Sequence, residues 1–69
     1  MKKNTIGYII NAKHRWNNGK LVRVTGFSLG INREPCVEYT KGCNIHAESC
    51  ENGVKIEKFI LGARNFRPF

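Results

Sequence analysis

The chain of 69 residues contains no aspartate, and its five acidic residues are all glutamates. No two of them form an evident pair for acid–base catalysis. The chain also lacks an apolar run long enough for a membrane span or a secretory leader. A domain of this size has little core to give up for a deep pocket. We therefore expect one domain over residues 1–69, with 1–5 frayed, that is not an enzyme and has no small-molecule substrate and no membrane association.

Cysteine is scarce and its number is odd, with Cys36, Cys43 and Cys50 seven residues apart. This pattern without a leader indicates a reducing compartment, so we predict a cytoplasmic location, reduced thiols and no bound metal or other cofactor. Together with His46, the three cysteines would also supply a Cys3His set for structural zinc, which is the alternative. A couple of His46 with Cys43 or Cys50 is the one nucleophilic arrangement that the sequence offers, without sign of a pocket.

Basic residues are plentiful, and they are unevenly distributed along the chain. Twelve lysines and arginines give a formal net charge of +7. Residues 1–33 carry seven of them and no acidic residue, residues 34–57 carry all five glutamates, and residues 58–69 carry three more basic residues. A one-sided positive field suits a polyanion or an acidic protein surface, whereas a merely solvated basic surface is the plainer explanation.

The clearest local pattern begins at Asn18-Gly19, a pair typical of a type I′ hairpin turn. A strand over 20–27 follows, with Val22 and Val24 on the inner face and Arg23 and its polar neighbour Thr25 on the outer face. Gly26 ends the regular alternation, which predicts a bulge or a sharp bend there.

Shorter alternating stretches predict further strands at 6–10, 36–40 and 54–57, the last after a second Asn-Gly turn at 52–53. In the first of these strands Ile6, Tyr8 and Ile10 share a face, and in the second Val37 and Tyr39 point inward. Residues 28–35 read as a loop. Two stretches are ambiguous: 43–50 is a short helix or an irregular strand, and 59–61 is a buried strand or one helical turn. The fold class predicted is mainly β, a small antiparallel barrel or strongly curled sheet of four to five strands with at most one short helix.

The segment Gly19-Lys20-Leu21-Val22-Arg23-Val24, followed by a polar loop and Val37-Glu38-Tyr39, resembles a group of small bacterial and phage proteins. These have a Gly-x-x-Tyr-Arg-Val strand and a Val-Val-Tyr strand, and the resemblance implies a barrel of the Src-homology-3 or Tudor type. Val22, Val24, Gly26 and Gly30 are also similar to the KOW motif, without its later glycine and strand. Either resemblance covers about residues 19–40.

Basic and aromatic residues alternate in two places, 13–16 and 64–69. Such mixtures suit nucleic acid, because cations displace counterions from phosphates and exposed rings stack on bases. The sequence therefore predicts a domain that binds DNA or RNA through a basic face, and the residues expected to carry it are Lys13, Arg15, Trp16, Lys20, Arg23, Arg64 and Arg67. The alternative is a phage or mobile-element protein that binds the acidic surface of a host protein and inhibits or redirects it. The competing role of Trp16, Phe66 and Phe69 is as core residues, and we expect at least two of these three rings to be buried.

Overall fold

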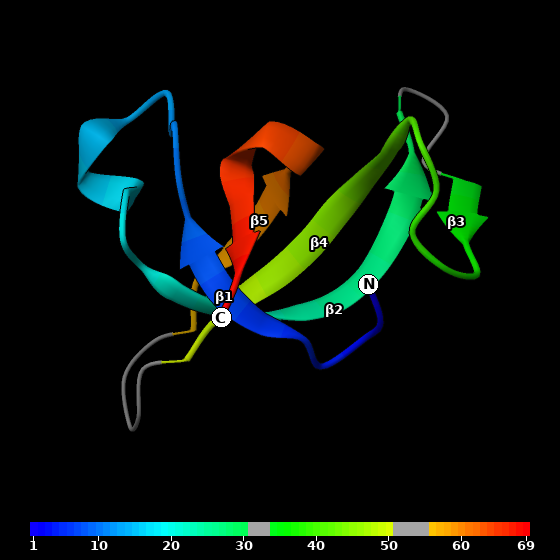
Figure 1. Cartoon of the computed structure of the whole chain (residues 1–69), viewed down its shortest axis with the longest axis horizontal. Coiled ribbons are helices and arrows are strands. Elements are labelled where there is room, and N and C mark those ends of the chain that lie inside the picture. The colour runs from blue at the N-terminus through cyan, green and yellow to red at the C-terminus, as the bar shows by residue number, and fades with distance from the viewer. Residues whose placement is uncertain (31–33, 51–55) are drawn as a thin grey trace.

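The computed structural model describes residues 1–30, 34–50 and 56–69. Six strands form one antiparallel sheet, and they are β1 (Ile6–Ile9), β2 (Leu21–Leu29), β3 (Glu34–Cys36), β4 (Cys43–Ser49), β5 (Lys58–Leu61) and β6 (Phe66–Pro68) (Figure 1). The helical parts of the described residues are two single 3-10 turns, η1 (Arg15–Asn17) and η2 (Ala63–Asn65). The mainly β class predicted from the alternation is confirmed.

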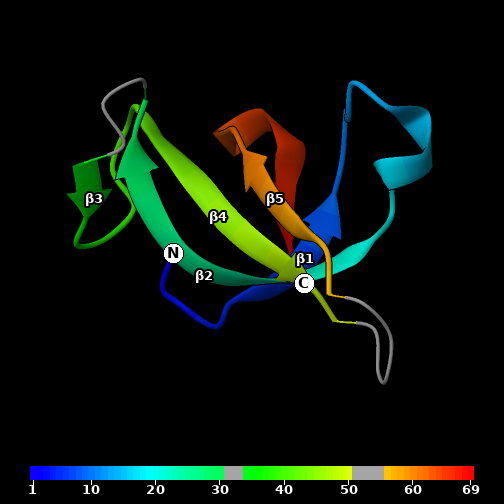
Figure 2. The ribbon, with the colours of Figure 1, turned by 180° about the vertical axis from the view of Figure 1, so that it is seen from behind.

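The strands lie in the order β5-β4-β2-β1-β6, and β3 pairs with the second half of β2. Figure 1 shows β2 and β4 side by side along a strongly curved path, and Figure 2 shows β5 alongside β4 from behind. Within the described residues no pairing joins the two edge strands, β5 and β6. The sheet is therefore curled and open, not a closed barrel, and it has more strands than the sequence predicted.

The central strand β2 follows its predicted pattern. Val22 and Val24 are fully buried, while Arg23 and Thr25 are exposed. The register against β4 shifts between Val24 and Gly26, which is the bulge expected at that glycine. The strand then continues to Leu29, so the loop predicted from residue 28 begins later than expected.

The Asn18-Gly19 turn differs in type from the prediction. Asn18 has φ −63° and Gly19 has φ +82°, and the backbone N–H of Lys20 donates to the carbonyl of Asn17 (3.3 Å). These values belong to a type II turn, in which positive φ is needed at the second central residue alone. The turn links η1 to β2 instead of joining two paired strands directly, so the twist-matching I′ geometry is not required.

The buried face of β1 is the opposite of the apolar face read from the sequence. Gly7 and Ile9 are buried, whereas Ile6 and Tyr8 are about one-third exposed. The side chain of Phe66 on β6 occupies the space over Gly7 and supplies the bulk that the glycine lacks. The alternation in the sequence was right in period, and a contact from the other end of the chain decides which face is buried.

The first residues, expected to be frayed, are joined to β2 in this structure. The backbone N–H of Asn4 donates to the carbonyl of Val24 (2.7 Å), and the N–H of Val24 donates to the carbonyl of Thr5 (2.9 Å).

A disulfide joins Cys36 at the end of β3 to Cys43 at the start of β4. The prediction of reduced thiols is therefore wrong for this pair, and Cys50 is the free cysteine. The chain turns away from the sheet after Cys36, which leaves Val37 99% exposed and not inward-facing. Tyr39 does pack inward, edge-on against Phe27 with ring centroids 5.8 Å apart.

The ambiguous stretch 43–50 is a strand with strict alternation, because Cys43, Ile45, Ala47 and Ser49 are all buried. The other ambiguous stretch, 59–61, is also a strand and belongs to β5. β5 lies at the edge of the sheet, and Ile60 in it is exposed instead of buried. The second Asn-Gly turn at 52–53 and the first half of the strand expected at 54–57 lie outside the described residues. Its second half, Ile56 and Glu57, is not in a strand, and β5 begins at the next residue. The core lies on one side of the curled sheet and consists of Ile9, Val22, Val24, Phe27, Cys43, Ile45, Ala47, Leu61 and Phe66. In the described ranges, no helix has the length and apolar character that crossing a membrane requires.

Candidate nucleic-acid interface

The connection between β1 and β2 presents the chain's single tryptophan to solvent. Trp16, in η1, is 71% exposed, and its ring stacks on the imidazole of His14 with centroids 4.6 Å apart and an interplanar angle of 18°. Lys13 and Arg15 flank the pair and are also exposed. Of the two roles weighed for Trp16, the core role does not fit a ring in this position. Phe69 is exposed as well, so the expectation that two of the three rings are buried is wrong, and only Phe66 of the three belongs to the core.

The connection is held by its own hydrogen bonds. The backbone N–H of Ala12 donates to Oδ1 of Asn18 (2.8 Å), and the N–H of Gly19 donates to the carbonyl of Ile9 (2.8 Å). The 3-10 turn adds a bond from the N–H of Asn17 to the carbonyl of His14 (3.0 Å). The basic and aromatic side chains therefore project from an ordered turn, which lowers the entropy cost of binding a ligand.

Two asparagines fasten η2 to this connection. The side-chain amide of Asn65 donates to the carbonyls of Asn11 (2.9 Å) and Ile10 (3.3 Å), and the amide of Asn11 donates to the carbonyl of Arg64 (3.2 Å). Arg64 is thereby brought next to a segment about fifty residues away in sequence. We call this combined region, Lys13, His14, Arg15, Trp16 and Arg64, the basic loop surface.

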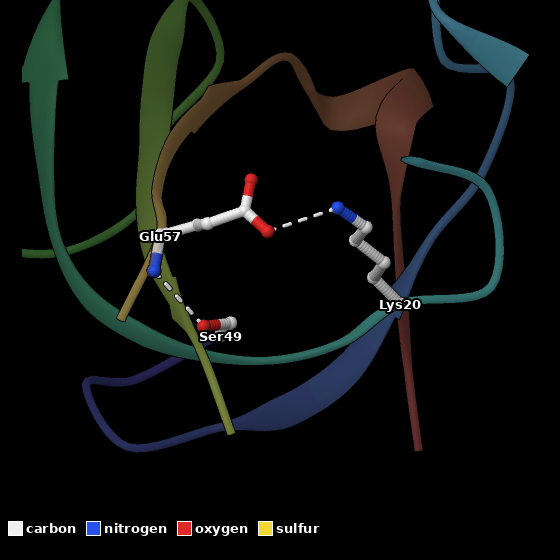
Figure 3. Close-up of polar contacts among 3 residues, drawn as sticks. All are labelled: Lys20, Ser49 and Glu57. Carbon is white, nitrogen blue, oxygen red and sulfur yellow. Dashed lines mark hydrogen bonds and ion pairs between the residues drawn. The ribbon is translucent and has the colours of Figure 1, made fainter. Parts of the chain in front are cut away.

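Lys20, expected to extend this surface, lies elsewhere. Its Nζ is 3.1 Å from Oε1 of Glu57 and 5.6 Å from the ring centroid of Phe59. Figure 3 shows the two charged side chains pointing toward one another, with the Glu57 backbone N–H donating to Oγ of Ser49 (3.0 Å). The pair is on the core side of the sheet, where the cation already has an anionic partner.

Arg23 and Arg67 are on the outer side of the sheet, away from the core. Arg23 donates to the carboxylate of Glu48, its neighbour across β2 and β4. That hydrogen bond, and then the charge of the carboxylate, raise the pKa of Arg23 above the ordinary arginine value. Arg67 is exposed and stands opposite Tyr8.

The seven residues predicted from the sequence are thus in different situations. In the part of the chain that the structure describes, the ion pairs are those of Lys20 and Arg23, and the four other cations make none. Three of these four, Lys13, Arg15 and Arg64, belong to the basic loop surface, and the fourth is Arg67. These are the predicted positions whose charge is available to a ligand.

The set considered for zinc is not assembled. Cys36 and Cys43 are joined to each other, while Oγ of Ser28 lies 2.6 Å from Nε2 of His46. Cys50 follows the far end of β4, at the opposite end of that strand from Cys43. Among residues 1–30, 34–50 and 56–69 no cluster of three metal-ligating side chains occurs, and His46 hydrogen-bonds to serine instead of to a thiol.

Sequence reasoning missed several residues that build the surface. His14 falls within the stretch 13–16 but is not among the predicted binding residues, although its imidazole stacks on the tryptophan ring. Asn11 and Asn65 make the hydrogen bonds that join η2 to the connection between β1 and β2, and no local sequence pattern predicts them. The positive φ of Asn11 (51°) shows that a turn-forming asparagine is used there.

No protein-family model, curated protein sequence or solved structure matches this chain. The resemblance to Src-homology-3, Tudor or KOW-type proteins therefore stays a prediction, and the function has to be argued from the chain's own geometry.

Proposed function

We propose that this protein is a non-enzymatic domain that binds nucleic acid through the basic loop surface. The observation that carries the proposal is Trp16, which is held in solvent by His14 and is flanked by Lys13 and Arg15. An exposed ring beside cations that make no ion pair within the described residues is the combination that base stacking and phosphate contact use. A phage or mobile-element origin and a cytoplasmic location remain compatible with this function.

The surface is suited to phosphate contact and not to reading base edges. Its side chains project from the connection between β1 and β2 and from two short 3-10 turns, not from a helix or ribbon of the size that enters a major groove. Binding should therefore depend on salt and discriminate little between sequences.

The test is fluorescence anisotropy with labelled mixed-sequence DNA and RNA of about 20 nucleotides, longer than the site of one small single-strand-binding fold. Affinity should fall steeply between about 50 and 200 mM salt. Trp16→Ala should weaken binding about fivefold or more, as expected for one lost stacking contact, at an unchanged melting temperature. Arg15→Glu should weaken binding to all sequences alike.

The matched control for Arg15→Glu is Lys41→Glu. The connection between β3 and β4, which contains Lys41, lies at the opposite end of the molecule from the basic loop surface (Figure 1). The two changes lower the formal net charge by the same amount, so a loss of affinity confined to Arg15→Glu is specific to the basic loop surface. Absence of binding to any DNA or RNA at low salt would overturn the proposal and transfer the surface to an acidic host protein.

A further inference from the structure

A second group of exposed rings lies on the outer side of the sheet. Tyr8 of β1 stands opposite Arg67 of β6 on one side and opposite Leu21 of β2 on the other. One step along the strands, the backbone N–H of Phe69 donates to the carbonyl of Ile6 (2.8 Å), which places these two side by side. We call these five residues, Ile6, Tyr8, Leu21, Arg67 and Phe69, the outer-face patch.

The rings in this patch contact each other but little else covers them. The centroids of Tyr8 and Phe69 are 5.6 Å apart and the rings are tilted by 38°. Phe69 is 83% exposed, and Tyr8, Ile6 and Leu21 are each exposed by more than one-third. The core side of the same strands is already filled by Ile9 and Phe66, so the fold does not use the outer rings for its own packing.

The charge beside the rings is positive and available. Arg67 makes no ion pair within the described residues and lies directly across from Tyr8. Arg23 of β2 is the cross-strand partner of Ile6, but its charge is paired with that of Glu48. A ring pair with one uncommitted guanidinium is the combination that stacks on bases and contacts the phosphate between them.

We propose that the ligand is single-stranded nucleic acid and that the outer-face patch is its second contact region. Unpaired bases stack on Phe69 and Tyr8, and Arg67 contacts the backbone. This inference rests on the proposed function and restricts it, because the bases of a duplex are stacked on each other and offer no face to a side chain. A second copy of the chain is disfavoured as the occupant by the formal charge of +7.

The probes are oligo(dT) of about 20 nucleotides and the same strand annealed to oligo(dA), a length that exceeds one single-strand site. Phe69→Leu keeps an apolar side chain but removes the ring, and Arg67→Gln removes the charge. Each should weaken oligo(dT) binding about fivefold or more while duplex binding changes little. Phe69→Trp keeps an aromatic ring at this position and should bind oligo(dT) about as tightly as the unmodified protein. Leu29→Ala, at the far end of β2, truncates an exposed apolar residue outside the patch and should have no effect.

Each result decides between this inference and the proposed function. Wild-type affinity in Phe69→Leu and Arg67→Gln, together with weakened binding in Trp16→Ala, would overturn the second contact region and leave the basic loop surface intact. Equal affinity for oligo(dT) and the duplex would overturn the single-strand assignment alone. No binding to either probe would overturn both. A dimer in sedimentation that Phe69→Leu dissociates would assign the patch to a second copy and overturn the inference.

Discussion

Gly7 of β1 lies directly beneath the ring of Phe66 of β6, two residues separated by almost the whole chain. A Cβ placed on Gly7 would be 2.5 Å from Cζ of that ring, and it would also collide with the backbone oxygen of Arg67. Ile9 and Phe66 are paired across the same two strands and both are buried. The absence of a side chain at Gly7 is therefore what lets β6 close against β1.

Replacing this glycine should destabilise the fold. Gly7→Ala forces the ring or the strand to move, which typically costs about 1–3 kcal/mol in an overpacked core. For a domain of this size each kcal/mol lowers the melting temperature by roughly 4–8 °C. Thermal unfolding followed by circular dichroism measures the change.

Gly26→Ala adds the same methyl group where nothing lies within 4 Å, and it is the matched control. Its free energy of unfolding should stay within about 0.5 kcal/mol of the parent value. Equal losses in the two variants would show that the contact with Phe66 is not the cause.

The disulfide should contribute measurably to stability. Joining Cys36 to Cys43 closes a short loop, and loop-closure entropy gives about 2.5 kcal/mol for a link of that span. Urea unfolding with and without reductant should show this difference, and Cys50→Ser should leave it unchanged. Alkylation of the denatured, unreduced protein should label Cys50 alone. Labelling of all three cysteines would contradict the link. Disulfides are uncommon in a reducing cytoplasm, so this link counts against the predicted cytoplasmic location, which stays a prediction.

How much of this fold the sequence could predict depends on the range of the interactions involved. Val22 and Val24 were assigned correctly because a half-buried strand shows its inner face by local alternation. The face of β1 was assigned wrongly because Phe66, far away in sequence, decides it. The inward position predicted for Val37 was wrong for a similar reason. β3 ends at Cys36, which is joined to Cys43 on another strand, and Val37 lies beyond that end.

The candidate site was predictable in composition but not in arrangement. The mixture at 13–16 could be read directly, and the structure leaves it exposed as a unit. The side to which Lys20 points could not be read, because a residue between a turn and a strand has no fixed face until its partner Glu57 is placed. The outer position of Tyr8 and Phe69 depends on the pairing of β1 with β6, which joins the two ends of the sequence.

The position of the basic loop surface should depend on Asn65, a residue that does not belong to it. Asn65→Ala removes the bonds to Ile10 and Asn11, each worth about 1 kcal/mol. We expect a modest loss of stability, faster amide hydrogen exchange at 10–12 and weaker binding to oligo(dT). Asn44→Ala, a change at a half-buried asparagine of β4, is the control. Unchanged exchange and affinity in Asn65→Ala would show that the connection holds its shape alone.

Lys20 and Arg15 should differ in what their charges do, although both were predicted to bind phosphate. The Nζ of Lys20 is engaged by Glu57 at 3.1 Å, whereas Arg15 is exposed and makes no ion pair in the described residues. Lys20→Met should therefore lower stability by up to about 1 kcal/mol, the range for partly exposed pairs, and change oligo(dT) affinity less than about twofold. Arg15→Met should leave stability unchanged and weaken binding.

The salt dependence of binding separates these two roles most sharply. Each phosphate contact with a single strand adds about −0.7 to the slope of log K against log salt. Arg15→Met should reduce the magnitude of that slope by about this amount, and Lys20→Met should leave it as it is, because an ion pair within the protein releases no counterion from the nucleic acid. Anisotropy titrations at several salt concentrations measure both slopes. A reduced slope in Lys20→Met would mean that Lys20 leaves Glu57 for a phosphate when the ligand binds.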